Sequence, residues 1–407
     1  MHKSFIKRLE ALKPSDFPSV LSGEWPAYLT HFLSLSGHDE KEYSHYLGVS
    51  LGDRKKYLSQ LDAETQSLLS DKLYENSQKQ FKFIDLFSGI GGFRMSLNQH
   101  GGLCVFSSEW DKSAKETYFK NYKEIPFGDI TKFTNKKISD EQLDVLIPDH
   151  DILSAGFPCQ PFSRAGVSAR NSLNLRHGFE CGTQGTLFYD VVRIANIKKP
   201  KVLFLENVRN LKSHDKGNTF KIIQESIEEI GYTFSHELIN AQTMVPQKRV
   251  RCYMVCTRND IPKFKFDMGV FDGTPIPLTT ILEKGKAILD YQISEKLWSG
   301  HINRTKRNIE RGAGFTAMEV DISKPANTLV ARYGKDGKEC LIPTTKGQPP
   351  RKLTRREAAR LQGYPDSFTL PESKTPTYKQ MGNSVAVPVV SEIARQITEH
   401  LRNNDEL

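Results

Sequence analysis

A short apolar run followed at once by a cluster of glycines is the feature that most constrains the fold of this chain. Residues 83–87 (FIDLF) have the composition of a buried strand, and residues 88–92 (SGIGG) follow as a turn that leads into a helix beginning near Gly92. Glycines at a first strand-to-helix turn let the backbone approach a ligand closely, as in dinucleotide-binding folds. Because the spacing is Gly-x-Gly-Gly and not Gly-x-Gly-x-x-Gly, the turn by itself could also be only a tight connection.

A second predicted strand, in residues 104–111 (CVFSSEWD), ends in an acidic residue, Glu109, about twenty positions after the glycine turn. In nucleotide-binding α/β folds, a carboxylate at this place accepts hydrogen bonds from ribose hydroxyls. Trp110 beside it offers a flat apolar face for an adenine ring, and Asp129, in the segment GDI, supplies a carboxylate that could accept a hydrogen bond from an exocyclic amine. Together these residues predict an adenosine pocket without a phosphate cradle.

Cys159 follows a third predicted strand and stands in the segment GFPCQPFSRAG. A thiol at the carboxyl end of a buried strand points into a crevice. Pro158 and Pro161 restrict the backbone on both sides, and Gly156 and Gly166 let a loop leave and return. An isolated cysteine is more often a packed core residue. Here the polar, glycine-bounded surroundings favour a nucleophile.

Strands alternate with helices from residue 81 to about residue 257, and this order predicts a doubly wound α/β sheet. The chain of 407 residues exceeds a usual single domain, so two or three units are expected. In residues 1–80 the pattern predicts helices at residues 4–12, 25–35, 40–47 and 54–74.

The glycine turn and the Cys159 segment, together with four later motifs, resemble the DNA (cytosine-5)-methyltransferase family. The later motifs follow in the family's order: residues 200–208 (PKVLFLENV), 247–251 (QKRVR), 353–365 (LTRREAARLQGYP) and 378–385 (YKQMGNSV). The resemblance covers about residues 82–394, and residues 183–188 and 211–217 are most similar to the bacterial Dcm-type branch. It implies a Rossmann-like methyltransferase sheet, S-adenosyl-L-methionine as the methyl donor and double-stranded DNA as the substrate.

The resemblance also implies a division of the chain and a set of site residues. We expect an N-terminal helical extension (residues 1–80), a catalytic domain that binds S-adenosylmethionine (81–258), a smaller target-recognition domain (259–350) and a C-terminal segment that returns to the catalytic domain (351–407). The residues expected to bind the cofactor are Phe87, Gly89, Gly91, Glu109, Trp110, Asp129, Ile130, Pro158 and Asn383. Those expected to contact DNA are Gln160, Ser163, Arg164 and Arg332. No metal site is expected.

The residue types suit methylation of a cytosine ring at C5. Since C5 is a poor nucleophile, electrons must first enter the ring, and a thiolate from Cys159 that adds to C6 achieves this. Glu206 leaves a predicted strand where it can hydrogen-bond N3 and the exocyclic amine. Arg249 and Arg251 could hold O2 or the flanking phosphates. The alternative is a pair of surface cations that follow a strand, and for Arg249 this alternative has equal weight.

A cytosine inside a duplex cannot reach a thiol in a crevice, so the base must be flipped out. Residues 161–183 are polar with few large apolar side chains, and they are expected to form a loop that folds over the target, with an ordinary surface excursion as the alternative.

Charge is distributed unevenly along a chain whose formal net charge is +9. Residues 1–80 contain 10 Lys and Arg against 11 Asp and Glu, a net of −1, whereas residues 258–360 contain 20 against 12, a net of +8. The excess lies where a target-recognition domain is expected, and the phosphate backbone is its natural partner. Residues 328–342 predict a β-hairpin around GKDG, and Arg332 is our candidate for reading guanine in the major groove, with a solvent-facing hairpin as the alternative.

Other readings remain open at this stage. An RNA (tRNA) cytosine-5 methyltransferase shares the motifs, whereas an amino-methyltransferase lacks support because Pro-Cys stands where its Pro-Pro signature is expected. The N-terminal segment could pack, contact flanking duplex or act as a helix-turn-helix regulator. Six scattered cysteines without a secreted pattern, and no apolar run long enough to span a bilayer, favour a cytoplasmic location. We also expect a monomer. A restriction endonuclease of the same system is a possible partner without direct contact.

Overall fold

The computed structural model describes residues 3–13, 15, 19–34, 53–61, 63, 66–67, 79–158, 187–312, 317, 319–345 and 347–407. Within them the chain forms two compact units. The first comprises Met1–Leu238, Cys252–Phe266 and Ile393–Leu407, and the second comprises Ile239–Arg251 and Asp267–Glu392. The division of function among residues 1–80, 81–258, 259–350 and 351–407 stays a prediction, because compactness assigns no role to a unit.

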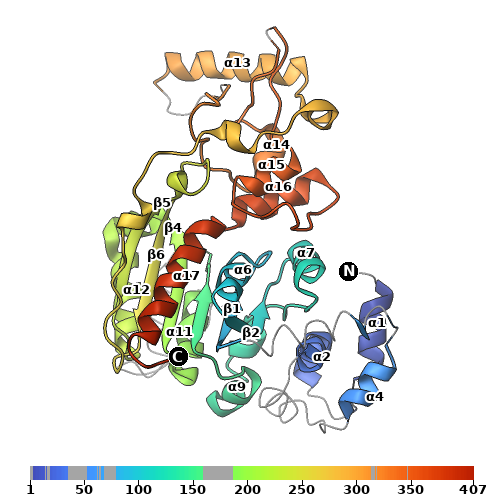
Figure 1. The fold of residues 1–407 in the computed structure, drawn as a ribbon, viewed down its shortest axis with the longest axis vertical. Coiled ribbons are helices and arrows are strands. Elements are labelled where there is room, and N and C mark those ends of the chain that lie inside the picture. Colours follow the sequence, from blue (N-terminus) through green and yellow to red (C-terminus); the bar gives the residue numbers. More distant parts are fainter. Residues whose placement is uncertain are drawn as a thin grey trace. The chain divides into compact units, whose positions relative to one another are not determined.

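A six-stranded sheet in the order β2-β1-β3-β4-β6-β5 organises the molecule (Figure 1). Its strands are β1 (Phe81–Leu86), β2 (Gly102–Ser108), β3 (Ile152–Ala155), β4 (Val202–Val208), β5 (Ser235–Asn240) and β6 (Val250–Thr257). β1 pairs in parallel with β2 and with β3, and β3 pairs in parallel with β4. The predicted α/β sheet is confirmed. Because chain order reverses between β1 and β3, the carboxyl ends of these strands border the crevice where open α/β sheets bind ligands.

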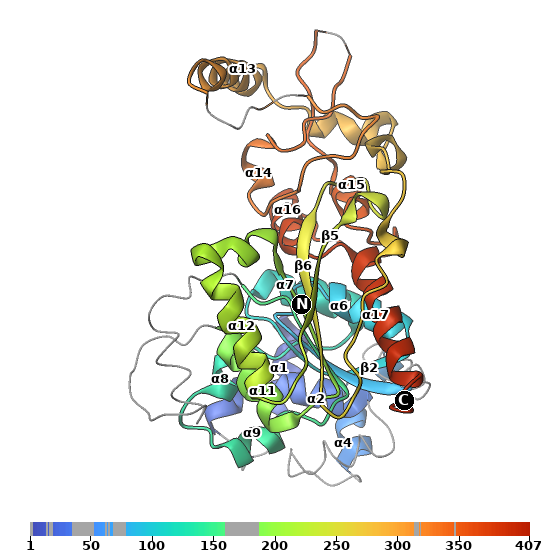
Figure 2. The ribbon, with the colours of Figure 1, turned by 90° about the vertical axis from the view of Figure 1, so that its left-hand side faces the viewer.

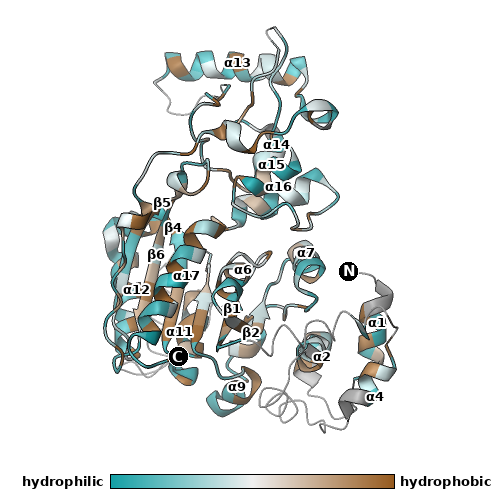
Figure 3. Ribbon diagram, in the orientation of Figure 1, coloured by the Kyte–Doolittle hydropathy of each residue, from teal (hydrophilic) through white to brown (hydrophobic). Residues whose placement is uncertain are grey.

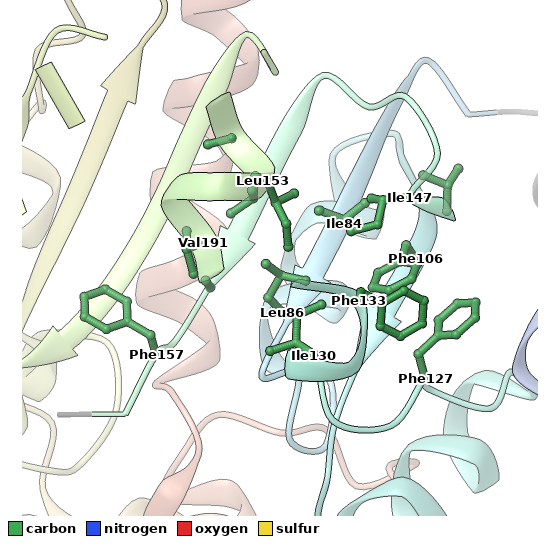
Figure 4. Packing of buried hydrophobic residues seen from close by; sticks show 14 of the residues in the cluster. Ile84, Leu86, Phe106, Phe127, Ile130, Phe133, Ile147, Leu153, Phe157 and Val191 are labelled. Atoms are coloured by element: carbon green, nitrogen blue, oxygen red, sulfur yellow. The ribbon is translucent and has the colours of Figure 1, made fainter. Parts of the chain in front are cut away.

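The two faces of the sheet carry alternate residues of each strand. One face presents Ile84 and Leu86 of β1 and Leu153 of β3, and these pack in the main hydrophobic cluster with Phe106 and Val191 (Figure 4). Apolar colouring follows the central strands, as Figure 3 shows. Helices of the N-terminal segment contribute to this cluster, and so do α8 (Thr131–Thr134), α9 (Asp140–Leu146), α11 (Leu187–Lys198) and α12 (Asn218–Glu229).

The opposite face is covered by α6 (Gly92–Gln99) and by α17 (Val387–Arg402). In α6, the Phe93 ring packs edge-on against Phe204 of β4, with ring centroids 4.9 Å apart. Near the end of α17, Arg402 donates a hydrogen bond to the side chain of Gln80, just before β1. Figure 2 shows α17 and α12 on opposite sides of the sheet. The helix α7 (Lys112–Tyr122) follows β2, and the 3-10 helix η2 (Arg209–Gly217) follows β4.

The N-terminal segment is part of the first unit. It forms α1 (Lys3–Ala11), the 3-10 helix η1 (Ser19–Glu24), α2 (Trp25–Ser34) and α4 (Asp53–Ser59). The predicted helices at residues 4–12 and 25–35 are therefore confirmed to within a residue or two, α4 covers part of the one at 54–74, and the one at 40–47 lies outside the described residues. Described residues of α2 are buried on all sides, which explains why its sequence lacks a polar face.

The second unit contains short helices and extended segments. Its α-helices are α13 (Glu295–Glu310), α14 (Tyr333–Asp336), α15 (Arg355–Arg360) and α16 (Lys374–Asn383). Its 3-10 helices are η3 (Ala241–Thr243), η4 (Gly269–Phe271), η5 (Leu278–Ile281) and η6 (Gly285–Tyr291). None of the helices in the described ranges is both long and apolar enough to cross a bilayer.

The hairpin predicted for residues 328–342 was wrong. Tyr333 begins the short helix α14, which ends at Gly337 in the left-handed conformation (φ 67°). The Tyr333 ring is fully buried, and its hydroxyl donates to the Cys340 carbonyl (2.6 Å) while accepting from the Leu353 N–H (2.8 Å). Tertiary anchoring of this ring thus fixes a helical turn, and a glycine read as a hairpin turn serves as a helix C-cap.

Candidate functional site

The glycine turn after β1 has the unusual backbone that the sequence suggested. Phe87, Gly89 and Gly91 all have positive φ angles, of 57°, 55° and 85°. A Cβ at Gly91 would lie 2.3 Å from the Tyr122 ring, whose hydroxyl donates to the Gly91 carbonyl (2.7 Å). At Gly89, in contrast, a Cβ would meet no atom within 4 Å. The turn is therefore closed against Tyr122 at Gly91 and open at Gly89, where a ligand can approach the backbone.

Glu109 joins this turn to the end of β2. One carboxylate oxygen accepts the Gly89 N–H (2.8 Å), and the other accepts the Asp111 N–H (2.6 Å). Burial raises the pKa of Glu109 above its usual value, and the two N–H groups oppose that rise. Each carboxylate oxygen can accept a second hydrogen bond. Glu109 is thus held in one position with acceptor capacity left for a ligand's hydroxyls.

The other predicted cofactor residues of the first unit lie around the same strand ends. Trp110 is 80% exposed, so its indole face is available for stacking. Asp129 is exposed and accepts the Thr131 N–H (3.0 Å). Ile130 is buried in the hydrophobic cluster (Figure 4), so a cofactor contact there falls to its backbone. Pro158, which directly precedes Cys159, is exposed and is the last described residue on this side of Cys159.

These residues fit S-adenosylmethionine. An anchored carboxylate suits the ribose, an exposed indole suits the adenine, and an open glycine turn suits close approach of a ligand to the backbone. Asn383, the last residue of α16, is exposed and belongs to the second unit, so its predicted contact with the cofactor stays a prediction.

The ends of β3 and β4 bring Glu206 to the start of the Cys159 segment. Ala155 of β3 is in register with Leu205 of β4, so Gly156 and Glu206 follow side by side. A Cβ on Gly156 would lie 3.8 Å from the Glu206 Oε2 atom. The neighbouring Asn207 side chain donates to the Phe157 carbonyl (2.9 Å). Glu206, the predicted catalytic carboxylate, is therefore buried at the carboxyl end of β4, next to the backbone that leads toward Cys159, and Cys159 itself is outside the described residues.

The remaining described cysteines are poor candidates for a nucleophile. All four thiols are free and buried: Cys104, Cys252, Cys256 and Cys340. Burial raises the pKa of Cys104 and of Cys252 to about 12, and raises that of the other two as well. Since the thiolate is the reactive form, these groups are unreactive near neutral pH. Within the described ranges no cluster of three or more His, Cys, Asp or Glu residues could hold a metal ion.

Arg249 is buried and engaged by backbone within the second unit. Its guanidinium donates to the carbonyls of Leu329 (3.3 Å), Gly382 (3.4 Å) and Ser384 (2.5 Å). This geometry supports a structural role, and the predicted contact of Arg249 with the cytosine or a phosphate stays a prediction. Arg251 is partly exposed and donates to the Val250 carbonyl (2.9 Å).

Arg332, the predicted base-reading residue, lies at the N-terminal end of α14 and not on a hairpin. It is about half exposed, and its Nε lies 3.5 Å from the Glu339 carboxylate. The side chain remains accessible, but the two-stranded ribbon that was expected to carry it into a groove does not form.

Two sets of residues that matter for these sites were missed by the sequence reasoning. Gln247, in the QKRVR motif, is fully buried, donates to the Leu361 carbonyl (3.0 Å) and accepts the Leu329 N–H (2.8 Å). Under the glycine turn, the buried Arg94 guanidinium contacts Glu124 and the Tyr118 hydroxyl. For Arg94 the available signal was a charge next to the apolar residues that begin α6, because such groups are buried only when paired; Gln247 offered no comparable signal.

Comparison with known proteins identifies a family. The family model for C-5 cytosine-specific DNA methylase matches residues 81–399. The Type II methyltransferase M.SsoII of Shigella sonnei is 45% identical over 335 residues, which cover 80% of this chain and 82% of that protein. A DNA-cytosine methyltransferase of Escherichia coli K12 is 38% identical over 388 residues, covering 84% and 82%. The crystal structure of S. pombe Dnmt2 methyltransferase superposes with a TM-score of 0.62 at 18% identity, over 80% of this chain and 99% of that one, and it shows the shared fold.

Proposed function

The chain belongs to the C-5 cytosine-specific DNA methylase family, and from this premise we propose that it methylates a flipped-out cytosine through a covalent bond between Cys159 and C6. The enzyme is a DNA (cytosine-5)-methyltransferase that uses S-adenosylmethionine. The observation that carries the proposal is the position of Glu206, whose carboxylate lies beside Gly156, three residues before the thiol.

The mechanism assigns separate tasks to the thiol and the carboxylate. The Cys159 thiolate adds to C6, and the electron pair of the C5–C6 double bond becomes available at C5. Glu206 hydrogen-bonds N3 and the exocyclic amine and stabilises the charge that addition creates on the ring. When bound, S-adenosylmethionine supplies an electrophilic methyl group. After C5 is methylated, it loses its proton to a base, water or hydroxide being our candidate, and the bond between Cys159 and C6 breaks.

The cofactor residues hold the donor in place in this proposal. Glu109 accepts from the ribose hydroxyls, Trp110 stacks on the adenine, and Asp129 accepts from the exocyclic amine. Gly89 leaves the backbone of the turn open to the donor, and Gly91 lets the turn pack against Tyr122. We propose that Asn383 also contacts the cofactor.

The substrate in this proposal is double-stranded DNA with a short specific site, within a restriction-modification system. The Type II methyltransferases among the relatives support this. The basic segment from residue 258 to residue 360 supplies phosphate contacts and Arg332 reads a base. We propose that Gln160, Ser163 and Arg164 contact the DNA around the flipped base, that the enzyme acts as a cytoplasmic monomer, and that a cognate endonuclease acts separately.

The deciding experiment replaces Cys159 with Ala. The variant should lose methyl transfer while calorimetry still detects S-adenosylmethionine binding, and the parent should form a covalent adduct with DNA containing 5-fluorocytosine, because fluorine replaces the departing proton. An active Cys159→Ala enzyme would refute the covalent route. Bisulfite sequencing of DNA from expressing cells gives the methylated site, and a parallel panel of tRNA substrates tests the RNA alternative.

A further inference from the structure

The N-terminal segment contacts the part of the chain that leads into Asp129. Helix α2 is fully buried at Trp25, Leu29 and Phe32. The Tyr28 ring of the same helix packs edge-on against Phe127, with centroids 4.6 Å apart. The family match begins only at residue 81, so these contacts come from residues outside the matched region. These apolar contacts explain why α2 packs against the rest of the first unit. They do not explain the polar contacts beside them.

Glu24, the last residue of η1, makes the most specific of these polar contacts. One carboxylate oxygen accepts the Gly128 N–H (2.7 Å), and the other pairs with the Lys132 ammonium (2.7 Å). The carboxylate is only 3% exposed. A Cβ on Gly128 would lie 2.7 Å from the Glu24 Oε1 atom, so the carboxylate occupies the space that a side chain at position 128 would need. Charge-assisted hydrogen bonds of this kind in a buried setting are strong and directional.

The segment that Glu24 holds is fixed on its other side by the end of β2. The Phe127 N–H donates to the Ser107 carbonyl (2.7 Å), and the Glu109 N–H donates to the Phe127 carbonyl (2.9 Å). The Ser108 hydroxyl donates to the Gly128 carbonyl (2.9 Å). The peptide units just before Asp129 are therefore fixed between the strand that carries Glu109 and the carboxylate of Glu24.

We propose that Glu24 is a positioning residue for the S-adenosylmethionine site, acting through the Gly128 N–H to orient Asp129. The inference rests on the assignment of Asp129 to the cofactor's adenine. It gives the N-terminal segment a role in binding the methyl donor, distinct from contacts with DNA. Glu24 does not touch the cofactor in this account.

Two conservative variants of Glu24 separate its contact with the Gly128 N–H from its negative charge. Glu24→Asp keeps the charge but shortens the side chain by one methylene, so it loses the Gly128 N–H. Glu24→Gln keeps an oxygen that reaches Gly128 but loses the charge facing Lys132. We expect Glu24→Asp to raise the Kd and KM for S-adenosylmethionine about tenfold, the size of one lost charge-assisted hydrogen bond, with the KM for DNA unchanged. Glu24→Gln should stay within about threefold of the parent.

Two control variants test whether a loss of stability alone weakens binding of S-adenosylmethionine. In the parent, the Ile125 N–H donates to the Thr30 hydroxyl of α2 (3.2 Å), and Thr30→Val removes this hydrogen bond. The variant should have a lower Tm and an unchanged Kd for the cofactor. Glu10→Ala removes an exposed carboxylate from α1 and should change neither quantity.

The test measures the Kd for S-adenosylmethionine by calorimetry on the full chain, together with kcat and the KM values for S-adenosylmethionine and DNA. If Glu24→Asp binds S-adenosylmethionine as tightly as the parent, or if Thr30→Val weakens binding equally at the same loss of Tm, the inference is overturned. A parent protein that fails to bind S-adenosylmethionine, or that binds it but does not methylate DNA, would count against the proposed function itself, since those results precede any comparison of variants.

Discussion

Asp85 should make the stability of the protein depend on pH in a direction opposite to that of an ordinary carboxylate. The residue lies on β1 and is fully buried, and burial raises its pKa to about 7, against the opposing influence of the Arg94 charge. The Ser154 hydroxyl lies 3.3 Å from the Asp85 Oδ1 atom and 2.9 Å from the Ile84 carbonyl oxygen. The Ser154 hydroxyl has a single hydrogen to donate, and when Ile84 receives it, the Ser154 oxygen can accept a hydrogen bond from the protonated Asp85 carboxyl group.

The magnitude follows from linkage between protonation and folding. The folded state holds the Asp85 proton up to a pH of about 7, whereas the unfolded chain releases it near the ordinary aspartate pKa of 3.8. Asp85 therefore contributes stability that is complete below pH 3.8 and is lost as the pH rises through 7. Between pH 5 and pH 8 the loss amounts to about 2.5 kcal/mol.

The assay compares Asp85→Asn with the parent by urea denaturation at pH 5, 6, 7 and 8. The difference in unfolding free energy should shift in favour of the Asn variant by about 2.5 kcal/mol across this range, because Asn cannot ionise. Asp190 offers an internal comparison: burial raises its pKa to about 6, so Asp190→Asn should shift in the same direction by about half as much. A difference between Asp85→Asn and the parent that is constant with pH would refute the reasoning.

Three further predictions concern the glycine turn, the cofactor and Arg249. Gly91→Ala should lower the unfolding free energy by about 2 kcal/mol or more, because a Cβ at φ 85° meets the Tyr122 ring; a Tm equal to that of the parent would contradict this. Trp110→Ala should weaken S-adenosylmethionine binding by about 1–3 kcal/mol in calorimetry, and unchanged affinity would remove the indole from the site. Arg249→Ala should lower stability to urea by about 2–4 kcal/mol, because three backbone carbonyls lose a charged donor; a stable variant with a raised KM for DNA would instead place Arg249 against the substrate.

Periodicity and turn chemistry were sufficient to predict the sheet and the glycine turn after β1, where we propose that the cofactor binds. The apolar run 83–87 and the glycines after it produce β1 and a positive-φ turn, and Glu109 meets the backbone of Gly89. These contacts form between segments close in sequence, or between the ends of neighbouring parallel strands. Such proximity follows from the fold class alone.

Long-range contacts could not be predicted in the same way. Nothing near Glu24 in the sequence indicates that its carboxylate receives the N–H of Gly128, more than a hundred positions away. Arg249 looked like a cation at a strand end, yet three carbonyls distant in sequence surround its guanidinium. Residues 328–342 contain two short apolar runs around GKDG, as a hairpin would, but the buried Tyr333 ring anchors a helical turn there. In each case a tertiary partner decides the outcome over local propensity.

The packing of the C-terminal helix α17 on one face of the sheet has a consequence for biosynthesis. Ile393–Leu407 belongs to the same compact unit as β1, and the Arg402 guanidinium contacts Gln80 while the Glu406 carbonyl accepts from Lys201. Ribosomes make the strands of this sheet long before residues 393–407 emerge. The part of the sheet face that α17 covers therefore stays exposed while Asp267–Glu392 of the second unit is synthesised, and a translating cell must protect that apolar surface from aggregation until α17 is made.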